Sequence, residues 1–279
     1  MQELRDKVAV VTGGASGIGL AVARRAAAEG MRLVLADIDE PGLKVAVDEL
    51  ASGGTSVLGV PTDVSDPGAV EALAAQTVSN FGAVHVVHNN AGVGIGGPMW
   101  EVTDTDWKWV LGVNLFGVVN GIRAFVPRFI EQGEGHVVNT ASLAGLVSAP
   151  LMGPYNASKH AVVTISETLA KDLRMFGATG VGVSVLCPGF VKTGIAESER
   201  SRPQWAPPPE ESPVTEMLRA TFHNLVDNGI DAEPVAEAVI EAVKTNRFYI
   251  LTHDESQAAV AVRMRDILEG RTPSDTAIP

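Results

Sequence analysis

The sequence has few of the features that nucleic-acid binding, disulfide bonding or membrane insertion require. Among 279 residues, 21 Lys and Arg stand against 33 Asp and Glu, which gives a formal net charge of -12. Nucleic acids and anionic lipid surfaces are bound by basic patches, so this balance argues against both partners. The single cysteine, Cys187, excludes an internal disulfide and fits a reducing compartment. Because no apolar run reaches membrane-spanning length and residues 1–7 are polar, we expect a cytoplasmic protein without a signal peptide.

Metal-ligand clusters, linkers and repeats are also missing from the sequence. No group of His, Cys, Asp or Glu has metal-ligand spacing, so we predict no metal site. No charge block or Ser/Gly-rich linker divides residues 1–195. We therefore predict a single domain over residues 1–270, followed by a frayed tail over residues 271–279.

Short apolar runs that alternate with helical patterns dominate the chain. This alternation predicts an α/β fold with a Rossmann-like, doubly wound parallel sheet of seven strands and helices on both faces. Ligands of such sheets bind outside the carboxyl ends of the strands, where Asp37, Asp63 and residues 89–92 are predicted to lie. The predicted strands cover residues 8–11, 32–36, 57–60, 84–88, 135–140, 181–186 and 247–252. The predicted helices cover residues 20–30, 67–81, 105–131, 155–176, 214–226, 233–244 and 258–269.

A glycine-rich turn, Thr12-Gly13-Gly14-Ala15-Ser16-Gly17-Ile18-Gly19, follows the first predicted strand. Glycines allow the backbone to turn tightly and to approach a pyrophosphate, which then rests on the N-terminus of the next helix. The spacing is Gly-x-x-x-Gly-x-Gly and differs from the commoner Gly-x-Gly-x-x-Gly, so a plain strand-to-helix turn is the alternative.

Asp37 ends the second predicted strand, about 20 residues beyond the glycines, where dinucleotide-binding folds place an acid. A carboxylate there accepts hydrogen bonds from both adenosine ribose hydroxyls and repels a 2′-phosphate, so NAD is favoured over NADP. The alternative is that Asp37 or Asp39 only caps the following helix. The glycine turn holds no Lys or Arg, and none directly follows Asp37, which supports the cofactor interpretation.

Tyr155 and Lys159 are four residues apart, which places them on one face of a helix. A nearby ammonium favours the phenolate, so we expect the pKa of Tyr155 to fall from about 10 toward the range of a general acid or base. The same spacing occurs on many helix surfaces without any function. Ser142 offers a hydroxyl upstream, and Asn114 is a polar residue on an apolar helix face, where a hydrogen-bonded core asparagine is the alternative.

Taken together, these motifs resemble the classical short-chain dehydrogenase/reductase family over roughly residues 5–195, and more weakly to the end of the chain. The matching elements are Thr12-Gly13-x-x-x-Gly17-x-Gly19, Asp63-Val64, Asn89-Asn90-Ala91-Gly92, Asn114, Ser142, Tyr155-x-x-x-Lys159 and Pro188-Gly189. The resemblance implies an NAD-dependent oxidoreductase that interconverts a secondary alcohol and its ketone by hydride transfer. It also implies a homodimer or homotetramer, formed through the long helices predicted over residues 105–131 and 155–176.

The resemblance implies a role for each matching residue. Tyr155 would be the general acid/base, Lys159 would lower its pKa and hold the nicotinamide ribose, and Ser142 would bind the substrate oxygen. Asn114 would anchor a water that relays protons to Lys159. The implied cofactor site comprises Gly13, Ser16, Gly17, Ile18, Gly19, Asp37, Ile38, Asp63, Val64, Asn90, Ala91, Gly92, Tyr155, Lys159, Pro188, Gly189, Val191 and Thr193.

Two histidines depart from the family pattern. His85 stands where the family usually has an acid, and we expect it to be a hydrogen-bonded residue at a strand end. His88 stands where the family usually has an aliphatic residue. We expect a hydrogen-bonded core histidine at this position, with a pH-sensitive group near the cofactor as the alternative.

The strand–helix rhythm stops after Thr193, and residues 203–209 hold four prolines and Trp205. The family places a mobile substrate lid here, so we predict a lid over about residues 194–230, with a disordered surface loop as the alternative. Ser142, Leu151, Met152, Tyr155 and Trp205 are the predicted substrate contacts. Among basic residues, only Lys192, Arg200 and Arg202 stand where they could pair with a substrate anion, so we expect a neutral, largely apolar alcohol or ketone.

Three other functions are weighed against this one. They are a non-catalytic dinucleotide-binding or sensor protein, an NADP-linked ketone reductase, and a lyase-like relative such as a dehalogenase that dispenses with nicotinamide. A sensor has no need of Asn114, Ser142, Tyr155 and Lys159 together. The complete glycine turn, Asp37 and Lys159 disfavour the lyase.

Overall fold

A seven-stranded, fully parallel sheet forms the centre of the computed structural model, which describes residues 1–208 and 213–275. The strand order is β3-β2-β1-β4-β5-β6-β7, so the direction of winding reverses between β1 and β4. In doubly wound sheets, ligands bind at the carboxyl ends of the strands beside this reversal. The predicted fold class is confirmed. The strands are β1 Val8–Thr12, β2 Arg32–Asp37, β3 Val57–Pro61, β4 Val86–Asn89, β5 Gly135–Thr140, β6 Val181–Cys187 and β7 Tyr249–Leu251.

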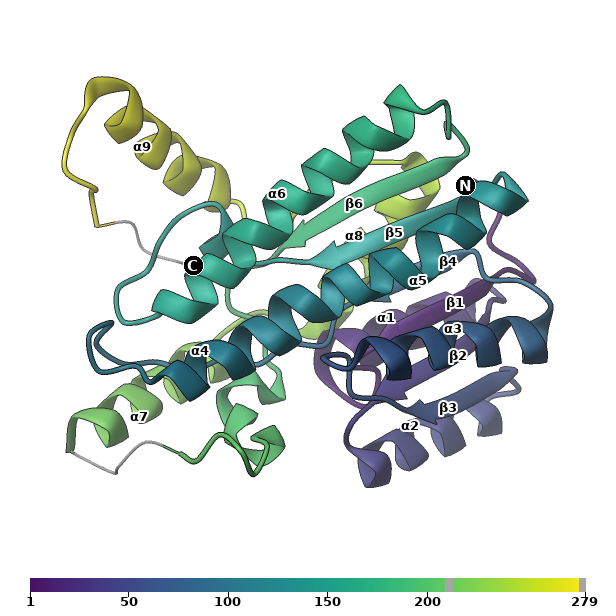
Figure 1. The fold of residues 1–279 in the computed structure, drawn as a ribbon, viewed down its shortest axis with the longest axis horizontal. Helices are drawn as coiled ribbons and strands as arrows, with labels where there is room; N and C mark the ends of the chain where they lie inside the picture. The colour runs from purple at the N-terminus through teal and green to yellow at the C-terminus, as the bar shows by residue number, and fades with distance from the viewer. Residues whose placement is uncertain (209–212, 276–279) are drawn as a thin grey trace.

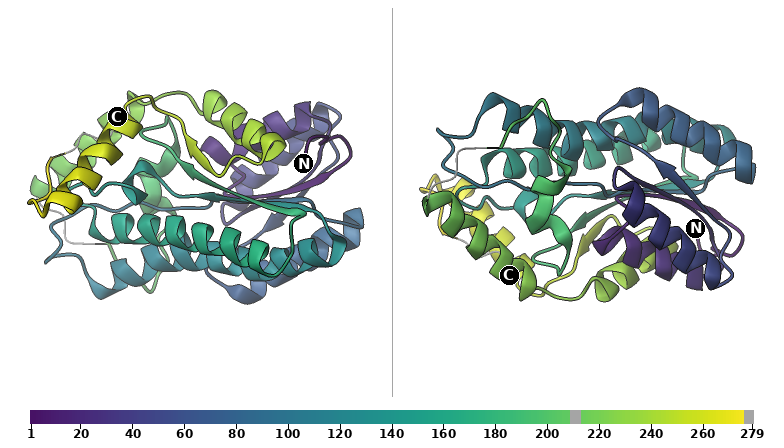
Figure 2. Two further views of the ribbon diagram at one scale, coloured as in Figure 1. Left: turned by 90° about the horizontal axis from the view of Figure 1, so that it is seen from above. Right: turned by 90° about the horizontal axis from the view of Figure 1, so that it is seen from below.

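Helices cover both faces of this sheet, as Figures 1 and 2 show. On one face lie α1 Gly17–Ala28, α2 Glu40–Ser52 and α8 Ala232–Thr245, and on the other lie α3 Pro67–Phe81, α5 Gly117–Gln132 and α6 Gly153–Met175. The remaining helical segments are α4 Asp104–Leu111, η1 Gly112–Phe116, η2 Leu143–Gly145, η3 Gly194–Ser201, α7 Pro213–Asp227 and α9 Ser256–Glu269.

Each central strand contributes to two hydrophobic cores. In β1, Ala9 and Val11 pack in the core beneath α1 and α8, whereas Val10 packs in the core beneath α3 and α5. Successive side chains of a strand point to opposite faces, so a strand covered on both faces is expected to be largely apolar. This explains the continuous apolar run of β1. The buried polar residues of β4 to β6, such as His88, Asn139 and Ser184, are hydrogen-bonded.

The helix predicted as one piece over residues 105–131 is continuous but changes its hydrogen-bond pattern midway. It consists of α4, a π-helical turn η1 that contains Asn114, and α5. A π-helical turn holds one more residue than an α-helical turn and leaves part of the regular hydrogen-bond ladder open, often at a functional site. The apolar periodicity on either side of this turn is that of an ordinary helix, so the sequence did not reveal it.

By length and composition, the continuous helical stretch Asp104–Gln132 could cross a membrane, with a mean hydropathy of 1.5 over its most apolar window. This differs from the expectation that no stretch reaches such a length. Within that window, 56% of the residues are buried inside the protein. A long core helix of a globular protein passes the same test.

Smaller differences concern the ends of elements. β4 starts at Val86, two residues later than predicted, and β7 is limited to Tyr249–Leu251. His85 lies just before β4, and its Nδ1 accepts a 3.1 Å hydrogen bond from the backbone N–H of Val8. The prediction of a hydrogen-bonded strand-end histidine is therefore confirmed.

Candidate active site

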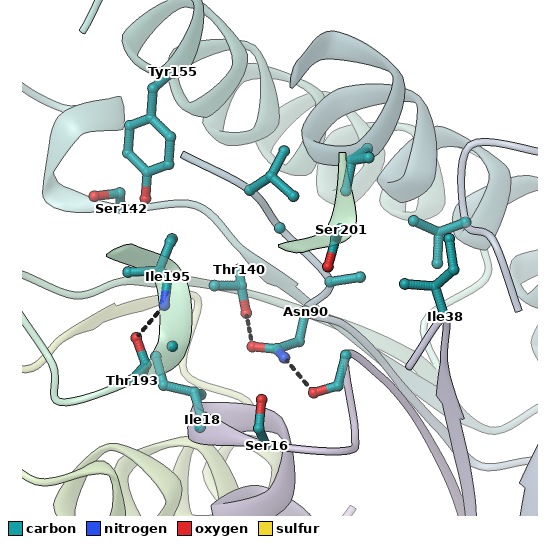
Figure 3. A pocket seen from close by; sticks show the side chains of 18 of the residues that line it. Ser16, Ile18, Ile38, Asn90, Thr140, Ser142, Tyr155, Thr193, Ile195 and Ser201 are labelled. Carbon is teal, nitrogen blue, oxygen red and sulfur yellow. Dashed lines mark hydrogen bonds between the residues drawn. The ribbon is translucent and has the colours of Figure 1, made fainter. Parts of the chain in front are cut away.

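A cavity runs along the carboxyl ends of the strands, from Asp37 at the end of β2 to Tyr155 at the start of α6. Figure 3 shows Ser142 and Tyr155 at one end of this cavity and Ile38 at the other, with Asn90 between them. Every residue predicted to bind the cofactor lines the cavity except Gly19. The predicted residues that line it are Gly13, Ser16, Gly17, Ile18, Asp37, Ile38, Asp63, Val64, Asn90, Ala91, Gly92, Tyr155, Lys159, Pro188, Gly189, Val191 and Thr193.

The glycines of the glycine-rich turn pack too closely on their surroundings to be replaced by residues with side chains. A Cβ atom on Gly13 would lie 2.9 Å from the Cα of Ala91, and one on Gly17 would lie 3.0 Å from the side chain of Thr193. Gly19 is absent from the cavity wall because it packs on the turn itself, where a Cβ would lie 2.0 Å from the Gly13 carbonyl oxygen. The turn therefore brings bare backbone to the cavity at the N-terminus of α1, a favourable place for a pyrophosphate.

Asp37 and Asp39, the two acids weighed as helix caps, have different roles. The Oδ1 of Asp39 accepts a 3.1 Å hydrogen bond from the N–H of Gly42 and caps α2. The Oδ2 of Asp37 instead accepts a 3.0 Å hydrogen bond from the N–H of Ala15, within the glycine-rich turn. The capping alternative thus applies to Asp39, while the carboxylate of Asp37 stays on the cavity wall beside the turn.

Asn90 connects the glycine-rich turn to the centre of the sheet. Its Nδ2 donates to the carbonyl oxygen of Thr12 at 3.0 Å, and its Oδ1 accepts from the hydroxyl of Thr140 at 3.3 Å. That hydroxyl also lies 2.8 Å from the Nε2 of His88. His88 is fully buried, and burial lowers its pKa to about 3. It is the hydrogen-bonded core histidine expected from the sequence, and the alternative of a pH-sensitive group near neutrality is wrong.

Tyr155 and Ser142 lie together at the other end of the cavity (Figure 3). Lys159 also lines the cavity. The Nζ of Lys159 donates a 2.9 Å hydrogen bond to the carbonyl oxygen of Thr140 and lies 5.5 Å from the centre of the Tyr155 ring. Burial lowers the pKa of Lys159 to about 8. Burial also raises the pKa of Tyr155 above its usual value, although the neighbouring Ser142 hydroxyl opposes this shift.

The predicted fall in the pKa of Tyr155 is therefore wrong for this structure. The prediction rested on the charge of Lys159 alone, but both side chains are buried and burial disfavours the charged form of each. The ammonium also donates a hydrogen bond to the Thr140 carbonyl at the end of β5.

Asn114 lies behind the cavity wall and is completely buried. Its Oδ1 accepts from the N–H of Val93 at 2.8 Å, and its Nδ2 donates to the Val93 carbonyl oxygen and to the Ser158 hydroxyl. A Cβ on Gly92 would lie 3.4 Å from that Oδ1 and 3.6 Å from the Nζ of Lys159. Asn114 is thus a hydrogen-bonded core residue close to Lys159, and the relay role implied by the resemblance stays a prediction.

The substrate end of the cavity has an apolar wall. Met152 and Trp205 line it as predicted, but Leu151 does not. The backbone of Leu151 adopts a positive φ of 63°, and its carbonyl oxygen accepts a hydrogen bond from the N–H of Gly97. No residue pattern around Leu151 indicates this turn. Further apolar residues that line the cavity are Val93, Trp109, Val113, Phe190, Ile195, Phe222 and Val226.

Several of these lining residues were missed from the sequence. Thr140 also lines the cavity, and its position at the end of β5 is a signal that could have identified it. Trp109 and Phe222 are far from any motif in the chain, and only the packing of α4 and α7 brings them to the wall.

Of the three basic residues weighed as partners for a substrate anion, only Arg200 lines the cavity. The Nζ of Lys192 pairs with Asp231 at 2.8 Å. Arg202 is held in a buried ion pair away from the cavity. Arg200 itself pairs with Glu197 at 3.0 Å. Lys108, which was not weighed from the sequence, and Lys159 also line the cavity. The expectation of a neutral substrate therefore stays a prediction.

The segment predicted as a lid over residues 194–230 is largely helical. It begins with η3 and ends with α7, and Ser201, Pro203 and Trp205 between them line the cavity. Residues 209–212, which include Pro209 of the proline-rich stretch, lie outside the described residues.

With this geometry in place, comparison with known proteins decides the family. The sequence matches the model of the short chain dehydrogenase family over residues 7–204. The chain belongs to this family. It is 35% identical over 278 residues to a CLA biosynthesis dehydrogenase/reductase of Lactiplantibacillus plantarum, covering 98% of this chain and 97% of that protein. A C alpha-dehydrogenase of Sphingobium sp. is 34% identical, with 99% of this chain and 90% of that protein covered.

A solved structure agrees with this assignment. The crystal structure of a short chain dehydrogenase/reductase from Burkholderia phymatum in complex with NAD superposes with a TM-score of 0.97 and is 48% identical, covering 99% of each chain. The predicted family and its enzyme class, oxidoreductases acting on CH–OH groups, are confirmed.

The site fits the nicotinamide dinucleotide that short-chain dehydrogenases use. A Cβ atom at Gly13 or Gly17 would clash with neighbouring atoms, so the glycine-rich turn needs glycine at these positions. The carboxylate of Asp37 lines the same cavity, where it would meet the adenosine ribose. Among residues 1–208 and 213–275, no three His, Cys, Asp or Glu side chains come together in a group that could hold a metal ion. The donors that line the cavity suit an organic cofactor.

Proposed function

We propose that this short-chain dehydrogenase uses NAD to interconvert a neutral, largely apolar secondary alcohol and its ketone. The observation that carries the proposal is the continuity of one cavity from Asp37 to the hydroxyls of Ser142 and Tyr155. A dinucleotide lying along that cavity would bring its nicotinamide end to these two hydroxyls. The non-catalytic sensor and the lyase give no reason for this arrangement.

The preference for NAD over NADP rests on Asp37. Its carboxylate is fixed by the N–H of Ala15 at 3.0 Å and by the N–H of Asp39 at 3.0 Å, and it faces the cavity with no basic residue beside it in the turn. A fixed carboxylate accepts hydrogen bonds from ribose hydroxyls and repels the 2′-phosphate of NADP. The related structure that holds NAD supports the same choice.

The residues at the nicotinamide end would handle the proton. The phenol of Tyr155 would give its proton to the ketone oxygen, and in the reverse direction its phenolate would take the proton from the alcohol oxygen, while the Ser142 hydroxyl hydrogen-bonds that same oxygen. Lys159 uses one N–H on the carbonyl of Thr140 and has two further donors for the ribose and for the Tyr155 side. When bound, NAD would supply the acceptor for the hydride that leaves the carbinol carbon. Asn114, next to Lys159, would support a water that carries the proton onward.

The substrate class is inferred from the cavity wall. Phe190 and Phe222 meet edge to face with ring centres 6.2 Å apart, and Met152 and Trp205 extend the apolar surface. Among the relatives are a C alpha-dehydrogenase and a 1-deoxy-11-beta-hydroxypentalenate dehydrogenase, and the second name denotes a hydroxylated substrate that also carries a carboxylate.

Assembly into a homodimer or homotetramer, and a cytoplasmic location, belong to the same proposal. The helical stretch Asp104–Gln132 leaves the apolar side chains of Phe116 and Ile130 about half exposed. The helices α4, α5 and α6 would form the interface between subunits.

A panel of secondary alcohols and ketones tests the proposal, with NAD and NADP supplied separately and absorbance of the reduced nicotinamide recorded. We expect turnover of at least one apolar member with NAD, and loss of about three orders of magnitude in kcat in Tyr155→Phe. Binding of NAD without turnover across the panel would instead support the sensor. Absence of NAD binding would support the lyase.

A further inference from the structure

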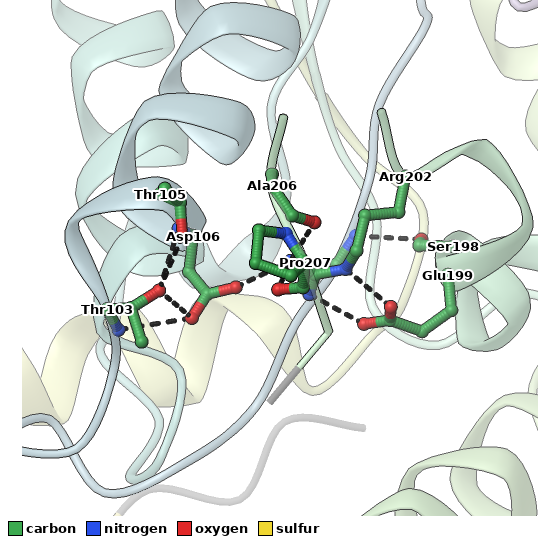
Figure 4. Close-up of polar contacts among 9 residues, drawn as sticks. Thr103, Thr105, Asp106, Ser198, Glu199, Arg202, Ala206 and Pro207 are labelled. Atoms are coloured by element: carbon green, nitrogen blue, oxygen red, sulfur yellow. Dashed lines mark hydrogen bonds and ion pairs between the residues drawn. The ribbon is translucent and has the colours of Figure 1, made fainter. Parts of the chain in front are cut away.

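Arg202 occupies an unusually enclosed position for an arginine. Its side chain is 5% exposed and its guanidinium reaches two carboxylates (Figure 4). Nη1 lies 2.7 Å from the Oδ1 of Asp106, while Nε and Nη2 lie 2.5 and 2.7 Å from the two oxygens of Glu199. Nη1 also lies 3.4 Å from the carbonyl oxygen of Ala206. The guanidinium is therefore fully engaged within the protein, which excludes it as a partner for a substrate anion.

Asp106 belongs to a different part of the molecule, the first turn of α4. Its Oδ2 accepts hydrogen bonds from the Thr103 N–H at 3.1 Å and from the Thr103 hydroxyl at 2.7 Å, which closes the capping box of that helix. The side chain of Asp106 is as enclosed as that of Arg202, at 6% exposed. One carboxylate thus caps α4 with one oxygen and binds Arg202 with the other.

The Asp106–Arg202 pair also reaches the cavity wall through an aromatic ring. The guanidinium of Arg202 lies over the ring of Trp109, with its Cζ 4.4 Å from the ring centre. Trp109 lines the cavity, whereas Arg202 does not. Trp109 packs in one buried cluster with Val93 and Ala206. Because Ala206 follows Arg202 closely in the chain, the ion pair and this cluster hold the same segment against α4.

The segment has a second attachment. The hydroxyl of Ser198 accepts a 2.9 Å hydrogen bond from the N–H of Gly94 and donates to the carbonyl oxygen of Ile195. Residues 194–206 are therefore tied at Ser198 to the loop after β4 and at Arg202 to α4. Between and beside these ties, Ile195, Ser201 and Trp205 face the cavity.

We propose that Arg202 is a positioning residue, which binds Asp106 and Trp109 to fix residues 194–206 as a wall of the substrate cavity. A buried ion pair adds little stability over apolar packing, but removing one partner leaves an uncompensated charge. The role assigned to this pair is therefore to select one arrangement of residues 194–206. The wall is then in place before any ligand binds. This contrasts with the mobile lid implied by the family resemblance.

Hydrogen exchange measured by mass spectrometry on the free protein tests the wall directly. Arg202→Met removes the fork that binds Asp106, and Asp106→Asn keeps a capping oxygen on Thr103 but removes the charge. We expect exchange across residues 194–206 to be at least about tenfold faster in both variants than in the wild type. The matched control is Arg200→Met, a substitution two residues before Arg202 that breaks the exposed ion pair between Arg200 and Glu197. This control should leave the exchange rates of residues 194–206 unchanged. Arg202→Lys keeps the positive charge but lacks the forked guanidinium, so its exchange rates should lie between those of the wild type and Arg202→Met.

A kinetic measurement separates positioning from general stability, and this part alone rests on the proposed function. The probe is the panel alcohol that the wild type oxidises fastest with NAD. Arg202→Lys and Asp106→Asn should raise its KM about tenfold while kcat changes less than about threefold. If no alcohol is turned over, the proposed function fails and the exchange result still decides this inference. Equal exchange in the wild type, Arg202→Met and Asp106→Asn would overturn it, and so would a fall in kcat at unchanged KM.

Discussion

The Nζ of Lys159 donates a 2.9 Å hydrogen bond to the backbone carbonyl of Thr140, so a buried ammonium joins α6 to the carboxyl end of β5. Thr140 in turn donates from its hydroxyl to Asn90, whose Nδ2 donates to the backbone of the glycine-rich turn. A chain of hydrogen bonds therefore runs from the Tyr155 end of the cavity to the cofactor turn.

Replacement of Lys159 should affect stability and activity in opposite directions. Burial lowers its pKa to about 8, so the ammonium destabilises the fold below that pH, and the penalty is relieved as the pH rises toward its unfolded pKa of about 10.4. We expect Lys159→Met to lose activity, and to be as stable as the wild type or more stable at pH 7, by on the order of 1–3 kcal/mol. Urea unfolding of the free protein at pH 7 and pH 9.5 measures this. A large loss of stability at pH 7 would contradict it.

The charge of Asp37 should set the choice between NAD and NADP. Asp37→Ala removes the repulsion of a 2′-phosphate and also the 3.0 Å hydrogen bond from Ala15. We expect NAD to bind roughly tenfold more weakly and NADP more tightly, so that the preference narrows. Asp37→Asn is the matched control for the charge, because its amide oxygen still accepts from Ala15. Calorimetric titration with both cofactors gives the ratio, and an unchanged ratio in both variants would show that Asp37 does not determine it.

Gly145 should tolerate no side chain, because η2 packs directly on α6. A Cβ on Gly145 would lie 2.6 Å from the carbonyl oxygen of Lys159, so Gly145→Ala must move α6 or η2. We expect a loss of roughly 2–4 kcal/mol in the free energy of unfolding and a fall in kcat larger than in KM. Gly53→Ala is the control, since a Cβ there meets nothing closer than 3.4 Å. Denaturant unfolding compares the two, and equal stabilities would contradict this account of the packing.

Mild acid should destabilise the protein through His88 and His136. Burial lowers the pKa of each to about 3, well below the unfolded value of about 6.5. The unfolded chain binds protons first, so stability is complete above pH 6.5 and is lost as the pH falls from 6.5 toward 3. We expect His88→Leu to lose less stability between pH 7.5 and pH 5 than the wild type, by on the order of 1–2 kcal/mol. Urea unfolding at both pH values measures this. The same pH dependence of the free energy of unfolding in the wild type and in His88→Leu would contradict the prediction.

The sequence by itself determined the parallel sheet and the position of the cofactor cavity. Strands covered on both faces are largely apolar, so their apolar runs identify them. Parallel strands all end at the same edge of the sheet, so the glycine-rich turn, Asp37 and Asn90 had to lie near one another once the strands were assigned. These features follow from local patterns and from topology.

Only the tertiary structure decided the features that depend on burial and on contacts between distant segments. The direction of the Tyr155 pKa shift follows from desolvation, which a helical spacing does not report. The π-helical turn at Asn114 and the positive φ of Leu151 carry no distinctive residue pattern. Arg202 finds Asp106 across 96 positions of sequence, and that pairing exists only because η3 and α4 pack together. Local chemistry places residues on elements, whereas packing decides which of them meet and how much water they lose.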